Sequence, residues 1–150
     1  MIHGYSTMKP IDFVKAVGVA AAVLAANVVI VILTVFGYST LIEPGHPAAF
    51  YESAALRIAP WCVHTAGTVL FFGAGYLLAR RRPQRNGLLF AATFSVLYAV
   101  TDAATVGFVG VFTVEFALSM VANLVAALAG AWRATHSLRR LSHVTERRSA

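Results

Sequence analysis

Charged residues are scarce in this sequence. They make up 12% of the 150 residues, whereas hydrophobic residues make up 59%, and an average soluble domain has about 25% charged residues. A soluble domain of this length cannot bury so much apolar surface, because its surface-to-volume ratio is high. The composition therefore excludes an ordinary soluble fold and predicts an integral membrane protein with a single domain over residues 1–150.

Cysteine and catalytic motifs are also nearly absent. Cys62 is the only cysteine, which excludes an intrachain disulfide and a CxxC redox pair. The sequence contains no phosphate-binding loop, no dinucleotide fingerprint and no paired-histidine or HExxH spacing. We therefore predict no metal site, and the sequence identifies no particular cofactor. The net charge of +6 does not predict nucleic-acid binding, because the basic residues stand in short runs beside apolar segments, as expected beside lipid headgroups.

Long uncharged runs are what the sequence does contain. They cover residues 16–42, 58–79 and 86–132, and the last run includes only Asp102 and Glu115 as charges. About 20 residues form a helix that crosses a bilayer, so the last run is long enough for two crossings with a turn near Gly107 and Gly110. The sequence thus predicts an all-α bundle of four transmembrane helices, near residues 13–37, 60–80, 87–107 and 112–133.

The basic residues predict the orientation of these helices. Eleven of the 12 lysines and arginines fall on one side of the predicted bundle, and Arg57 alone falls on the other. Because cytoplasmic segments are enriched in lysine and arginine, we expect both termini in the cytoplasm. Residues 134–150 then form a basic cytoplasmic tail. The predicted location is the plasma membrane, or the inner membrane of a cell with two.

The segment between the first two predicted helices has a structure of its own. Residues 43–47 read EPGHP, which is typical of a turn. Pro47 suits the first turn of a helix, so we expect residues 48–59 to form a short helix that lies on the outer interface.

Small residues predict where the helices touch. Lipid tails do not drive apolar helices together, so helix association in a bilayer relies on close backbone approach. Small residues recur four or eight positions apart on three predicted helices: Gly18, Ala22 and Ala26; Gly67 and Gly75; and Ala122, Ala126 and Gly130. We expect these stripes to be packing seams.

Polar residues within the predicted spans need an explanation, because an aspartate at a helix centre costs about 2.5–3.5 kcal/mol. They fall on single helix faces, and on three helices they lie toward the outer side. We expect a polar pocket that opens outward and binds a small ligand or ion. Its candidate residues are His64, Thr68, Tyr98, Asp102, Glu115, Ser119 and Asn123, and candidates that could cover its mouth are Glu43, His46, Glu52 and Arg57.

Each candidate also has a structural interpretation. Thr113 could cap the helix that begins near Glu115, whose carboxylate suits the helix dipole. Asp102 could be a hydrogen-bond hub for Tyr98, Thr105 or Arg57. The remaining amide and hydroxyl groups, those of Asn27, Ser119 and Asn123, could simply join helices.

Three functions are therefore compatible with the sequence. The first is a ligand- or ion-binding membrane protein, either a transporter or an accessory subunit, for which a homodimer would supply a thicker bundle. The second is an interaction protein whose polar stripes only specify helix packing. The third is a membrane enzyme that acts on a lipophilic substrate with Asp102, Glu115 and His64 as acid and base groups.

Overall fold

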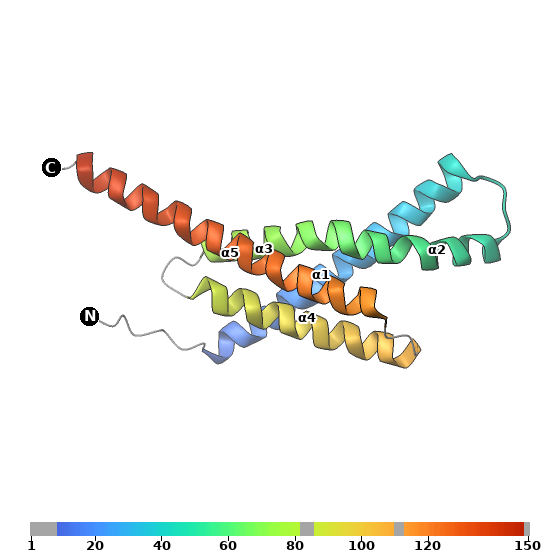
Figure 1. The fold of residues 1–150 in the computed structure, drawn as a ribbon, viewed down its shortest axis with the longest axis horizontal. Helices are drawn as coiled ribbons and strands as arrows, with labels where there is room; N and C mark the ends of the chain where they lie inside the picture. Colours follow the sequence, from blue (N-terminus) through green and yellow to red (C-terminus); the bar gives the residue numbers. More distant parts are fainter. Residues whose placement is uncertain (1–8, 82–85, 110–112, 149–150) are drawn as a thin grey trace.

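The computed structural model describes residues 9–81, 86–109 and 113–148, and all elements in these ranges are helical (Figure 1). The elements are α1 (Pro10–Gly37), η1 (Tyr38–Ile42), α2 (Ala48–Cys62), η2 (Val63–Gly67), α3 (Thr68–Arg80), α4 (Gly87–Val109) and α5 (Val114–Arg148). Four helical stretches are long and apolar enough to cross a membrane: Pro10–Ile42, Ala48–Arg80, Gly87–Thr105 and Val114–Ser137. The predicted all-helical chain with four candidate spans is confirmed.

Side-chain caps set the starts of the last two helices. The Asn86 side-chain oxygen accepts a hydrogen bond from the Leu89 N–H at 3.1 Å, and α4 begins at the next residue. The Thr113 hydroxyl accepts a hydrogen bond from the Phe116 N–H at 3.2 Å, which confirms the predicted cap. Such caps satisfy N–H groups that have no partner within the helix.

The second helical stretch starts much earlier than predicted. It begins at Ala48 and continues through η2 to Arg80, a run of 33 residues that extends about 50 Å at 1.5 Å per residue. Pro60 lies inside α2 and does not end it; the chain widens into the π-helical turn η2 three residues later. Residues 48–59 are thus helical, as predicted, but continuous with the span instead of separate from it.

The other three helices begin close to their predicted first residues, and α4 and α5 end later than predicted. The first helix starts at Pro10 and α4 runs to Val109, so Gly107 lies within a helix. Gly110 and the loop arginines Arg82 and Arg85 lie outside the described residues. Most of the predicted basic tail continues α5, which ends at Arg148.

The closest helix contact joins α3 and α5, which run in the same direction. A Cβ atom added at Gly75 would overlap the backbone of Ala127, and one added at Gly130 would overlap the backbone of Phe72. Glycine at both positions allows the two backbones to touch, as in other membrane helix pairs. The predicted seams at Gly75 and at Ala126 and Gly130 are therefore confirmed as buried contacts.

The predicted seam on the first helix is wrong for contacts within the chain. Gly18 and Ala22 are exposed, and a Cβ at Gly18 would meet nothing within 4 Å. The buried face of α1 consists instead of Ala16, Ala20, Val23 and Asn27, with Asp12 at its start. This face turns inward because it carries the Asn27 amide, which needs a hydrogen-bond partner away from lipid.

Figure 1 shows how the helices are arranged around these contacts. The first helix crosses the other three obliquely, packs mainly on α4, and diverges from them toward its end. The hairpin of α1 and α2 extends past the junction of α4 and α5. The start of α1 and the end of α5 lie on the opposite side of the molecule, together with the end of α3 and the start of α4.

Candidate functional site

Four helical stretches contribute to one buried polar layer, which we define as Asn27, Gly67, Thr68, Tyr98 and Asn123. The side-chain amide of Asn27 donates a hydrogen bond to the Tyr98 hydroxyl at 3.1 Å, which joins α1 to α4. The Thr68 hydroxyl lies 3.4 Å from the Asn123 side-chain oxygen, which joins α3 to α5. Asn27, Tyr98 and Asn123 are 4%, 2% and 1% exposed, so these contacts lie inside the bundle.

Gly67 brings the two amides of this layer together. A Cβ atom added at this glycine would lie 3.5 Å from the Asn27 side-chain oxygen and 3.6 Å from that of Asn123. Both amides therefore approach the same point on η2. A π-helical turn is uncommon and frequently marks a functional site, and here it is the element on which the polar side chains of α1 and α5 converge.

Some buried polar atoms near this layer have no hydrogen-bond partner in the described chain. They are the side-chain oxygens of Ser95 and Ser119 and the side-chain nitrogen of Asn123. More than nine in ten buried polar groups have a partner in proteins, and leaving one without a partner costs about 1–3 kcal/mol. Ser119 and Asn123 lie one helical turn apart on the same face of α5, so their free groups can serve one bound molecule.

Aromatic and apolar side chains support the layer on the side of α3 and α4. Phe71 packs edge-on against the Tyr98 ring with a centroid distance of 4.8 Å, and it stacks on Phe94 at 5.7 Å. Phe71 and Phe94 are almost completely buried. These rings fix the position of the Tyr98 hydroxyl opposite Asn27, and they give the layer one apolar wall.

The predicted titratable residues do not join the layer. His64 and Glu115 are exposed on the bundle surface, and Asp102 is half-buried one turn beyond Tyr98 on α4. Within the described residues, no hydrogen bond connects Asp102 to Tyr98, Thr105 or Arg57. Of the seven predicted span residues, Thr68 and Asn123 contact each other, and Tyr98 bonds Asn27 in the same layer. Ser119 is buried one turn from Asn123, whereas His64, Asp102 and Glu115 lie outside the layer.

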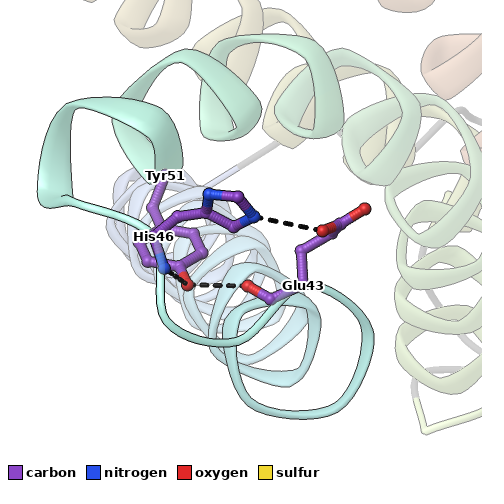
Figure 2. Close-up of polar contacts among 3 residues, drawn as sticks. All are labelled: Glu43, His46 and Tyr51. Atoms are coloured by element: carbon purple, nitrogen blue, oxygen red, sulfur yellow. Dashed lines mark hydrogen bonds and ion pairs between the residues drawn. The ribbon is translucent and has the colours of Figure 1, made fainter.

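The predicted outer loop and the first turn of α2 form a separate polar cluster, which Figure 2 shows. The Tyr51 hydroxyl donates to the Glu43 carbonyl oxygen at 2.7 Å and accepts from the His46 backbone N–H at 3.1 Å. The His46 ring lies 3.2 Å from the Glu43 carboxylate and stacks on Phe50 at 4.1 Å. Gly45, with φ of 87°, allows the turn between them. These contacts order the tip of the hairpin.

This tip does not cover the polar layer. It projects away from the junction of α4 and α5 (Figure 1), and Glu52 and Arg57 are exposed along α2. In the ranges that the structure describes, no three histidine, cysteine, aspartate or glutamate side chains are grouped so as to hold a metal. Glu43 and His46 are thus an exposed pair that stabilises a turn.

Two members of the layer carry only a weak signal in the sequence. Asn27 was interpreted only as a helix-joining residue, although an amide in a long apolar helix already needs a buried partner. Gly67 was interpreted only as a packing residue, and its place in a π-helical turn has no sequence signal. Comparison of the chain with protein-family models, curated proteins and solved structures finds no match. The function is therefore inferred from the residues themselves.

Proposed function

We propose that this chain is a small multi-pass membrane protein that binds a small ligand in the polar layer. The observation that carries the proposal is the set of buried groups without partners, in which the Asn123 amide nitrogen and the Ser119 hydroxyl lie on one face of α5. A bound molecule with a hydrogen-bond acceptor would pair with the Asn123 N–H groups, which can only donate.

The chemistry of the layer favours an uncharged ligand over an ion. All of its side chains are neutral, and the nearest carboxylate along α4, Asp102, is half-buried and lies one turn away. Transferring an ion into a buried site without a counter-charge is costly. A neutral molecule with a carbonyl or hydroxyl oxygen would pair with the amide nitrogen of Asn123.

We place this layer in the outer half of the membrane, with both termini in the cytoplasm. The proposal rests on the eleven basic residues of the predicted inner side against Arg57 on the outer side. Gly67 lies 13 residues before Arg80, or roughly 20 Å along the helix axis at 1.5 Å per residue. In hydrocarbon about 30 Å thick, that depth is nearer the outer surface. The start of α2, which lies 19 residues before Gly67, would then extend beyond the outer edge of the hydrocarbon.

A second candidate function is helix pairing alone. It is favoured by the two contacts Asn27–Tyr98 and Thr68–Asn123, which each join helices far apart in the sequence. Such bonds contribute about 0.6 kcal/mol each in membrane proteins. An interaction protein would need nothing more from the layer. The enzyme hypothesis receives no comparable support, because His64 and Glu115 are exposed apart from the layer.

Native mass spectrometry of the protein, extracted with its surrounding lipids, tests the ligand proposal. The wild-type chain is expected to carry a bound non-protein mass that Asn123→Leu loses. Thr65→Val is the control, since the exposed Thr65 hydroxyl donates only to the Trp61 carbonyl. A bound mass that persists in Asn123→Leu, or none in the wild type, would refute ligand binding and leave helix pairing as the function.

Cysteine labelling tests the proposed orientation. In a Cys62→Ala background, Ala48→Cys places a thiol at the exposed start of α2 and Ser137→Cys places one near the inner end of the last span. A membrane-impermeant maleimide added to intact cells is expected to label position 48 and to leave position 137 unlabelled. The reverse pattern would contradict the orientation.

A further inference from the structure

The packing of α3, α4 and α5 places arginines that are far apart in the sequence at one level of the bundle. Helices α3 and α5 run side by side, and a Cβ added at Gly87 would lie 2.8 Å from the Ala79 Cβ and 4.0 Å from the Thr135 side chain. Ala79 and Thr135 therefore lie at the same level of the bundle. Arg80 and Arg81 follow Ala79 directly, and Arg133 precedes Thr135 by two residues.

These three arginines, which we call the inner arginine cluster, are exposed and have no acidic partner among the described residues. Arg80, Arg81 and Arg133 form no ion pair there. The one acid at the start of α1, Asp12, is buried and accepts a hydrogen bond from the Lys9 backbone N–H. Three guanidinium groups at one end of a tight helix pair are thus available to an anion from outside the chain.

An exposed tryptophan places this cluster at the membrane surface. Trp132 is 55% exposed, and its ring lies 4.3 Å from the His136 ring. Tryptophan is enriched at the level of lipid headgroups, and Trp132 directly precedes Arg133. The guanidinium groups therefore lie where lipid phosphates are found.

We propose that the inner arginine cluster binds the headgroup of an anionic phospholipid. Guanidinium groups pair with phosphate through two parallel hydrogen bonds, which an ammonium group cannot form. Each basic residue near an anionic membrane surface strengthens binding about fivefold. The lipid is held by its phosphate on the arginines while its acyl chains lie along the exposed apolar surface of α5, which includes Val121 and Val125. This site is separate from the polar layer and does not depend on its function.

Fluorescence quenching by brominated lipids measures this preference directly. The protein carries Trp61→Phe, so that Trp132 is the only tryptophan, and is reconstituted in phosphatidylcholine vesicles that contain either brominated phosphatidylglycerol or brominated phosphatidylcholine. We expect phosphatidylglycerol to quench Trp132 at lower mole fraction. Replacing the three arginines by glutamine should reduce this preference about fivefold for each. Arg57→Gln, an exposed arginine at the other end of the bundle, should leave it unchanged.

A second variant keeps the charge that directs insertion. With all three arginines replaced by lysine, we expect insertion to persist and the preference for phosphatidylglycerol to fall at least fivefold, because the paired hydrogen bonds are lost. Full retention of the preference by the lysine variant, or equal quenching by both lipids in the wild type, would overturn the proposal. Competition by 10 mM inorganic phosphate would also overturn it, since a soluble anion would then suffice.

Discussion

The two halves of the bundle, which we propose to be its inner and outer halves, are built on different principles. In the inner half, α3 and α5 touch backbone to backbone, and Ala127, Ala131 and Ala134 have no exposed surface. In the outer half, α1 and α2 diverge into a hairpin whose Leu41 and Trp61 are 85% and 73% exposed. The polar layer lies where the tight part gives way to the open part. Close packing thus fixes the helix pair in one half, and the buried polar groups lie at the boundary with the open half.

The largest loss of stability is expected from a substitution that separates α3 from α5. We expect Gly75→Ala to destabilise the fold by about 3 kcal/mol, because its methyl group would overlap the Ala127 backbone. Gly73→Ala, two residues away, should be neutral or stabilising by up to about 1 kcal/mol, since a Cβ there meets nothing within 4 Å. Unfolding in mixed detergent micelles measures both. Equal effects of the two substitutions would contradict the tight seam.

A smaller loss of stability is expected from substitutions in the polar layer. Asn27→Leu removes the partner of the buried Tyr98 hydroxyl, so we expect a loss of about 2 kcal/mol. Asn123→Leu should cost less than about 1 kcal/mol in ligand-free protein, because it removes an amide nitrogen that has no partner. Thr68 also keeps its bond to the His64 carbonyl. The same unfolding assay compares the two, and a larger loss for Asn123→Leu would show that this amide is already fully bonded.

A smaller and local effect is expected in the outer loop. Tyr51→Phe keeps the ring but removes hydrogen bonds to Glu43 and His46, which should weaken the turn by about 1 kcal/mol. Hydrogen exchange of residues 43–47 should accelerate while global unfolding stays the same. Tyr38→Phe is the control, because the Tyr38 hydroxyl has no hydrogen bond in the described part of the chain. Acceleration by both variants would refute the role of the Tyr51 hydroxyl.

The smallest effect is expected for the exposed ion pair. Glu43 and His46 have side chains 48% and 42% exposed, so water screens their attraction, and the pair contributes no more than about 0.5 kcal/mol. Glu43→Gln should therefore change hydrogen exchange in the loop less than Tyr51→Phe does. A larger change would mean that the ion pair, and not the tyrosine, holds the turn.

The sequence predicted the helices far better than the way they face each other. Uncharged length is a property of the chain alone, and it located four spans because every crossing needs about 20 apolar residues. The extension of the second helix to Ala48 was missed, because the span was taken from the uncharged run that follows Arg57 and residues 48–59 were interpreted as a separate interfacial helix. Proline inside a long helix is tolerated when the backbone can widen, as it does at η2.

The sequence could not determine how each helix is rotated about its own axis, and thus which face meets its neighbours. Gly18 and Gly75 look alike as small residues in apolar helices, yet one is exposed and the other touches α5. Glu115, Ser119 and Asn123 share one face of α5 by their spacing. Only Ser119 and Asn123 are buried, because α5 begins to pack against its neighbours one turn after Glu115. Which face meets a neighbour depends on all four helices together, so Asn27 and Gly67 emerged only in three dimensions.

The most direct test is whether a water-soluble reagent can reach the polar layer from the outer side but cannot reach the seam between α3 and α5. In a Cys62→Ala background, Ser119→Cys and Ala131→Cys each place one thiol on a buried position of α5. A small charged methanethiosulfonate reagent added from the outer side is expected to modify position 119 and to leave position 131 unmodified. Equal protection of the two thiols would contradict an outward-opening polar site.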